Sequence, residues 1–236
     1  MELTASTVVL GLIWFAAFLF STTLHEAGHA LVAWRLGDPT AYHGGQVSLN
    51  PIPHMRREPF GMVIVPLLSY FGSPNHWMFG WASAPYDPTW AARHPRRAGA
   101  MALAGPVANL VLVILSGIGI RVGLATGGFT PPMEGLSYAH LVEAPAGGAL
   151  GGLAALLSVF FSLNLILFLF NLLPLPPMDG SGVIQLLLPE DVSRRWQLTI
   201  RQPLVGILGI LVAWRLFGYV LFPVFAVGLQ LLGLIE

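Results

Sequence analysis

The chain has 236 residues, of which 55% are hydrophobic and 9% are charged. This apolar fraction exceeds what a soluble domain of the same length needs, so the composition predicts an integral membrane protein. The formal net charge is zero, which gives no indication of nucleic-acid binding, and the absence of cysteine excludes disulfides and thiolate metal ligands.

The first apolar stretch, residues 8–34, contains three ionisable side chains in the motif HEAGH, from His25 to His29. Ionisable groups are costly to keep within a membrane segment, so three of them together indicate a function. On a helix, His25 and His29 lie one turn apart on the same face, a spacing that allows two imidazoles to bind one zinc ion while Glu26 remains free as a base. A metal-free cluster would leave these groups unpaired in lipid, which disfavours that alternative.

Two shorter segments follow before the next long apolar stretch. Residues 45–51 alternate polar and apolar side chains and end in turn-forming residues, which predicts a short strand or hairpin. Residues 60–71 are apolar but include Pro66 and are too few for a full crossing. Their length is more typical of a re-entrant or interfacial segment.

Three more apolar stretches are long enough to cross a bilayer, namely residues 98–122, 147–173 and 204–235. The last contains Arg215 and Pro223, so it is either one kinked span or a surface helix followed by a span. The predicted fold is an all-α polytopic membrane protein with about four to six membrane helices and a short strand, hairpin or re-entrant region near the active site. We expect a single integral-membrane domain over residues 1–236, without a PDZ-like or other soluble domain.

The placement of arginine predicts the orientation, because short cytoplasmic loops collect positive charge. Arginines are frequent between the first span and residue 98 and again after residue 173, whereas residues 123–146 contain neither arginine nor lysine. This pattern places the N-terminus outside, the end of the first span in the cytoplasm and the 123–146 loop outside. It also requires residues 60–71 to enter and leave on one side, and it brings the C-terminal halves of the first and third long spans together.

A carboxylate just beyond the 147–173 span supplies a candidate third ligand. Prolines end that helix, and Asp179 follows with almost no other charge nearby. Two imidazoles and one carboxylate leave the fourth tetrahedral position of zinc to water, which is the arrangement of a catalytic site. Asp179 could instead cap a helix or begin a turn with Gly180.

Three motifs together resemble the site-2 protease family of intramembrane zinc metalloproteases. They are the HExxH motif from His25 to His29, the AGPVAN run from Ala104 to Asn109, and the NxxPxPxxDG pattern from Asn171 to Gly180. The residues around Asn50 also resemble the corresponding segment in members of the family that lack accessory domains. The resemblance covers most of the chain.

The resemblance implies a zinc-dependent endopeptidase that hydrolyses a peptide bond in or near a transmembrane segment, as in regulated intramembrane proteolysis. One Zn²⁺ per chain would be held by His25, His29 and Asp179, with Glu26 as the general base that takes a proton from zinc-bound water. The expected partners are a membrane-protein substrate, the lipid bilayer and an adaptor or upstream protease, but no nucleic acid. We expect the chain in the plasma membrane of a prokaryote, with its active site towards the cytoplasm.

Two asparagines are candidate substrate contacts. The strand expected at residues 46–50, which includes Asn50, would pair with an extended substrate by edge addition. Asn171 would donate a hydrogen bond to the substrate backbone or to the oxyanion, or it would bond a neighbouring helix, as membrane asparagines often do. Gly105 and Asn109 are expected to allow close packing of the central span against the zinc helices.

A second class of function also fits these motifs, namely a catalytically silent zinc-binding membrane partner or regulator of the same fold. The intact Glu26 argues against it. A zinc peptidase that acts on soluble peptides would be expected to use a glutamate ligand on a later helix instead of Asp179. The remaining histidines lie in loops or at segment ends, where a lone histidine is usually solvated, and His54 is the least certain of them.

Overall fold

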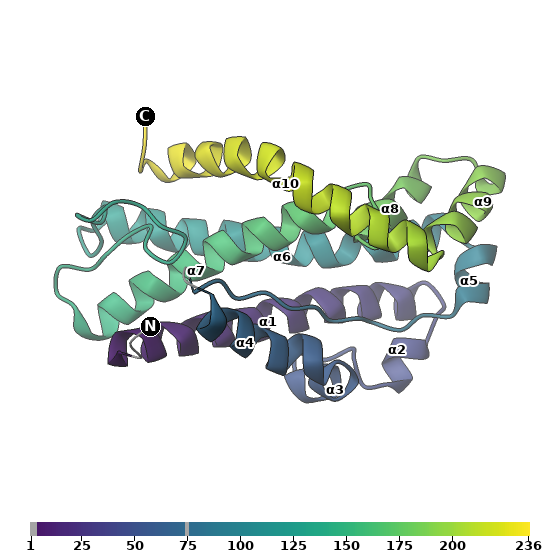
Figure 1. Cartoon of the computed structure of the whole chain (residues 1–236), viewed down its shortest axis with the longest axis horizontal. Helices are drawn as coiled ribbons and strands as arrows, with labels where there is room; N and C mark the ends of the chain where they lie inside the picture. The colour runs from purple at the N-terminus through teal and green to yellow at the C-terminus, as the bar shows by residue number, and fades with distance from the viewer. Residues whose placement is uncertain (1–3, 74–75) are drawn as a thin grey trace.

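The computed structural model describes residues 4–73 and 76–236, and it consists of helices joined by loops, with no strand among those residues. Four helices are long and apolar enough to cross a membrane, and they alternate in direction along the molecule (Figure 1). These helices are α1 (Ala5–Arg35), α6 (Pro95–Ala125), α7 (Gly148–Asn171) and α10 (Pro203–Leu232). The prediction of an all-α polytopic membrane fold is confirmed.

The helices α1, α6 and α7 form the centre of the bundle, and each packs against the other two. One core cluster joins α6, α7 and α10 through side chains that include Phe161 and Leu229. A second cluster joins α1 to α7 through Phe18 and Val159. Much of the outer apolar surface of α10 is exposed, as expected of a helix that faces lipid.

Residues 60–71 belong to a short apolar helix that does not continue as a span. The π-helix η1 (Phe60–Ile64) runs directly into α4 (Val65–Gly72), and the Tyr70 hydroxyl donates to the Thr7 carbonyl oxygen near the start of α1 (3.0 Å). Residues 77–87 then run in extended form to α5 (Pro88–Arg93), beside the C-terminal end of α1 (Figure 1). The excursion therefore begins and ends at the same end of the bundle, in agreement with the prediction from arginine placement.

The strand or hairpin predicted at residues 45–51 is wrong, because the segment contains a turn and a bend and ends at Pro51, where a helix begins. Ser48 Oγ accepts from the Asn50 N–H (3.0 Å), and Asn50 Oδ1 accepts from the Ile52 N–H (3.0 Å). Serine and asparagine side chains that bond the nearby backbone compete with strand pairing. Asn50 thus becomes the N-cap of α3 (Pro51–Arg57).

The bend is held in place by His54, which is buried and not solvated as a lone loop histidine usually is. Its Nε2 lies 3.1 Å from the Ser48 carbonyl oxygen. The neighbouring Gln46 donates from Nε2 to the Ser83 carbonyl oxygen (3.1 Å), which ties the bend to the returning segment. His54 therefore has a structural role in the connection that follows α1. The same connection contains the small helix α2 (Thr40–His43).

The chain between α7 and α10 forms three short helices at the end of the bundle that also holds α5 (Figure 1). They are α8 (Asp179–Val183), the 3₁₀-helix η2 (Ile184–Leu186) and α9 (Glu190–Ile200). Helix α10 runs without interruption through Arg215 and Pro223, so the alternative of a surface helix within residues 204–235 is wrong. The arginine-free loop at residues 126–147 lies at the opposite end of the bundle (Figure 1).

Candidate metal centre

Two histidines of α1 form the first half of the centre. His25 and His29 are both buried and one helical turn apart, with their Nε2 atoms 3.0 Å apart. Their rings are close to perpendicular, with centroids 4.7 Å apart. Both Nε2 atoms therefore point to one place between α1 and its neighbours.

Asp179 completes the group from a distant part of the chain. Helix α7 ends at Asn171, and a proline-rich turn leads to α8, which Asp179 begins. Asp179 Oδ2 lies 3.0 Å from His25 Nε2 and 3.3 Å from His29 Nε2. The turn thus delivers a carboxylate to the two imidazoles, and all three ligand atoms lie within 4.8 Å of one another.

The charge of Asp179 suits a cation. Its Oδ2 faces both imidazoles at hydrogen-bond distance, and the ionised form of a carboxyl group is the form that binds a divalent metal ion.

Gly105 of α6 makes room for the two imidazoles. A Cβ atom at this position would lie 2.3 Å from His29 Nε2 and 2.5 Å from His25 Nε2. Gly28 has a similar role on α1, where a Cβ atom would lie 3.1 Å from the Ala104 carbonyl oxygen. Helices α1 and α6 therefore approach closely at the level of the centre, and the close packing predicted for Gly105 is confirmed.

The second nitrogen of each imidazole is bonded to α6. His25 Nδ1 lies 2.5 Å from Asn109 Oδ1, and His29 Nδ1 lies 2.7 Å from the Met101 carbonyl oxygen. An oxygen at Nδ1 keeps the ring proton there and leaves the Nε2 lone pair for a metal. From the sequence, Asn109 was expected only to allow close helix packing, and its bond to His25 was not predicted. The available signal was an asparagine inside an otherwise apolar span.

Glu26 borders a cavity next to the ligands. The cavity has a volume of about 350 Å³ and is lined by Glu26, His29 and Asp179, together with the extended residues 82–84 and parts of α6, α8, η2 and α9. Its wall also contains the polar side chains of Gln185 and Gln197. A buried carboxylate beside candidate metal ligands, at the edge of a partly polar cavity, is suitably placed to exchange protons with a bound molecule.

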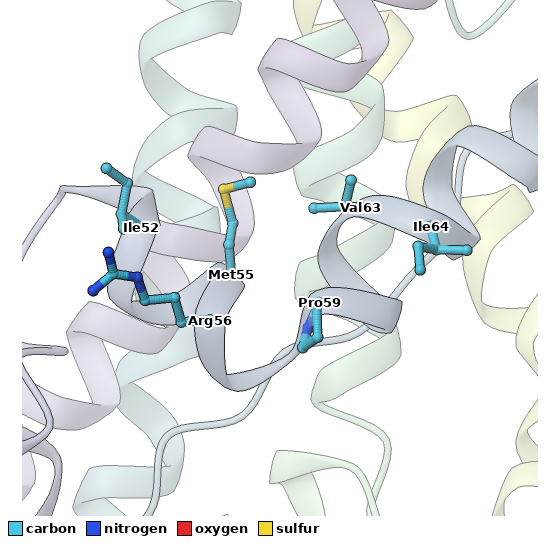
Figure 2. A pocket seen from close by; sticks show the side chains of 6 residues that line it. All are labelled: Ile52, Met55, Arg56, Pro59, Val63 and Ile64. Atoms are coloured by element: carbon cyan, nitrogen blue, oxygen red, sulfur yellow. The ribbon is translucent and has the colours of Figure 1, made fainter.

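A second hollow, of about 460 Å³, is separate from this centre. It lies where α3 meets η1, and the side chains that line it in Figure 2 are apolar except for that of Arg56. The side chains around it are Ile52, Met55, Arg56, Pro59, Val63 and Ile64. It therefore includes none of the candidate ligands or substrate contacts.

The two asparagines predicted to contact substrate do not line the cavity. Asn171 donates from Nδ2 to the Leu167 carbonyl oxygen of its own helix (3.0 Å), and not to a neighbouring helix. Asn50 is exposed and serves as the cap of α3. The structure gives both residues local structural bonds, and substrate contact by either one stays a prediction.

The residues of the centre fit a zinc ion. Two imidazole nitrogens and one carboxylate oxygen are a donor set of catalytic zinc sites. Ligand atoms about 2.0–2.1 Å from a tetrahedral ion lie roughly 3.3 Å from one another. The observed separations of 3.0, 3.0 and 3.3 Å agree with this value to within a few tenths of an ångström.

Comparisons with known proteins agree with the geometry. The sequence pattern of "Peptidase family M50" matches residues 13–213. The chain is 35% identical over 211 residues to "Putative zinc metalloprotease YwhC" of Bacillus subtilis, which covers 89% of this chain and 84% of that protein. It is 30% identical to "Putative zinc metalloprotease Rip2" of Mycolicibacterium smegmatis, over 76% of this chain and 58% of that protein. It is 29% identical to the protein of the same name from Mycobacterium tuberculosis, over 86% of this chain and 68% of that protein. No solved structure gives a significant match.

Proposed function

The chain belongs to peptidase family M50, the site-2 protease family, and from this premise we propose that it cuts its substrates within the membrane, with Glu26 as the general base. Its class of activity, that of a zinc metalloendopeptidase, follows from the family. The proposal concerns the place of the cut and the residues that act. It is supported above all by the convergence of His25, His29 and Asp179 among apolar helices, with Glu26 at the adjoining cavity.

We assign His25, His29 and Asp179 as the ligands of one zinc ion. When bound, zinc lowers the pKa of a coordinated water to about 7 and polarises the scissile carbonyl group. Glu26 holds the proton that this water loses at a carboxylate oxygen and transfers it to the departing amine nitrogen. Water would add to the carbonyl carbon, and the C–N bond would then break once the amine nitrogen has received the proton from Glu26, so the products are a carboxylic acid and an amine. The burial of Glu26 beside the cavity supports this role, because it limits exchange of the proton with bulk water.

The depth of the centre supports a substrate that spans the membrane. His25 lies ten residues before Arg35, where α1 ends, a distance of about 15 Å along a helix. A peptide bond at this depth belongs to a segment within the bilayer, and that segment must be locally unwound to expose the bond. Residues 46–50 form no strand, so they do not offer an edge to which an extended substrate could pair. The extended residues 82–84 line the cavity, and we assign the backbone pairing with the substrate to them instead.

We propose that the end of the bundle that carries α5 and α9 faces the cytoplasm, in the plasma membrane of a prokaryote. Arginines gather in the connections at this end, whereas the loop at residues 126–147 at the other end has none. The positive-inside rule supports this orientation, and the relatives named above come from bacteria. We also propose an adaptor or an upstream protease as a partner that helps to select the substrate.

Quantitative mapping of new protein termini tests this function. Membranes from cells that produce the wild type are compared with membranes from cells that produce Glu26→Gln at equal levels. Glutamine keeps the size of the side chain but cannot accept the proton, so termini inside transmembrane segments are expected with the wild type alone. The zinc content of the two proteins should be equal. Identical termini from both proteins under several stresses would contradict the proposal and favour a catalytically silent partner.

A further inference from the structure

We propose that Asn164 of α7 is a positioning residue that acts through Asn109 to fix which nitrogen of His25 is free to bind the metal. The inference rests on the proposed function, because it takes His25 as a ligand. It extends the centre to a third helix, since Asn164 itself does not line the cavity.

A buried chain of hydrogen bonds runs from α7 to the centre. Asn164 Nδ2 donates to the Phe160 carbonyl oxygen (2.8 Å) and to Ser21 Oγ of α1 (2.9 Å). Asn164 Oδ1 accepts from Asn109 Nδ2 (2.8 Å), and Asn109 Oδ1 lies 2.5 Å from His25 Nδ1. Asn164, Asn109 and Ser21 are completely buried, so no water competes for these bonds.

Every bond in this chain has a fixed direction, because the chain starts at a backbone carbonyl. The Phe160 oxygen can only accept, so the amide nitrogen of Asn164 must face it and the amide oxygen must face Asn109. Asn109 then presents its own nitrogen to Asn164, which turns its oxygen towards His25. An oxygen at that distance requires a proton on His25 Nδ1, and the lone pair is left on Nε2.

The proposed ligand atom of His25 is therefore determined from α7. His29 needs no such relay, because its Nδ1 bonds the Met101 carbonyl oxygen directly. For His25, a half-turn of the Asn109 amide would place an N–H group against Nδ1 and favour the wrong tautomer. Asn164 prevents that half-turn, because its own rotation would bring its oxygen against the Phe160 oxygen in a buried place.

A double-mutant cycle on zinc affinity tests the relay with the purified full chain in detergent. Asn109→Ala removes the direct partner of His25 and is expected to raise the Kd for zinc about 10- to 100-fold. Asn164→Ala leaves the Asn109 amide free to rotate. It is expected to raise the Kd for zinc by at least about threefold, but by less than Asn109→Ala does. Because Asn164 acts through Asn109, the double variant should bind zinc as Asn109→Ala does. Additive effects would overturn the relay and give Asn164 a separate role in helix packing.

A matched control is available on the same helix. Ser162 is buried on α7, and the structure gives its hydroxyl group no hydrogen-bond partner within the described ranges. Ser162→Ala is therefore expected to keep the zinc affinity of the wild type. A loss in this variant equal to that of Asn164→Ala would contradict the relay, because any change in the interior of α7 would then have the same effect.

Nitrogen-15 NMR of the zinc-loaded wild type tests the tautomer of His25 without a substitution at Asn109 or Asn164. The His25 signals, assigned by their absence in His25→Gln, should show a protonated Nδ1 and a metal-bound Nε2. Metal bound through Nδ1 would overturn the inference. Both measurements are made without substrate, so they separate the two proposals. A chain that binds zinc in this way but cleaves nothing would contradict only the proposed function, whereas additive variants in an active protease would contradict only the relay.

Discussion

Replacement of Gly105 by alanine tests the geometry of the centre most directly. The added Cβ atom would lie 2.3 Å from His29 Nε2, whereas ordinary contact begins near 3.4 Å. The shortfall of about 1.1 Å must be met by movement of the two imidazoles or of α6. Alanine is also the better helix former by about 1 kcal/mol, so local helix stability does not suffer from the substitution.

The displacement is large compared with what a zinc site tolerates. Metal–ligand distances hold to about 0.2 Å, so a shift of roughly 1 Å in either nitrogen removes it from the ion. Misplacement of a reacting group by about 1 Å can cost about 100-fold in rate. We therefore expect Gly105→Ala to lose most of its zinc and to cut a transmembrane substrate at least about 100-fold more slowly than the wild type.

The assay combines zinc content by mass spectrometry, cleavage of a transmembrane substrate and thermal unfolding of the purified chain. Gly152→Ala is the control, because Gly152 lies in α7 and a Cβ atom there would meet nothing within 4 Å. It should keep full zinc content and activity. Gly28→Ala should lie between the two, since its Cβ atom would be 3.1 Å from a backbone oxygen. Wild-type zinc content and activity in Gly105→Ala would refute the geometry described for the centre.

Three further predictions concern the ligands, the metal and the cap of α3. Asp179→Ala is expected to weaken zinc binding more than the roughly 10- to 100-fold that loss of an outer partner causes, and unchanged zinc content would contradict the assignment of Asp179 as a ligand. Removal of zinc by a chelator should abolish cleavage and added zinc should restore it, so activity that persists in the metal-free protein would contradict a catalytic ion. Asn50→Ala should lower the free energy of unfolding by about 1 kcal/mol through loss of the cap, without a change in kcat or KM. A raised KM at unchanged stability would instead support the predicted substrate contact.

The sequence predicted the centre well where short-range rules apply. A spacing of four residues puts His25 and His29 on one helix face whatever the rest of the fold does. Asp179 was identified because an isolated carboxylate after a proline-rich helix end has few other reasons to be there. The alternation of polar and apolar residues at 45–51 led to a wrong strand prediction. Ser48 and Asn50 bond the nearby backbone and Asn50 caps a helix, which the alternation alone does not reveal.

The sequence by itself determined the membrane character of the chain, the number of long apolar helices and the pairing of the two histidines on one helix face, because composition and helical periodicity act locally. Only the tertiary structure decided the bond between Asn109 and His25, its continuation to Asn164 and the clearance that Gly105 provides. These features join α1, α6 and α7 at one level of the bundle, and that level depends on how the helices slide and rotate against one another. The period of an apolar helix leaves this register open, so close packing and buried hydrogen bonds must set it.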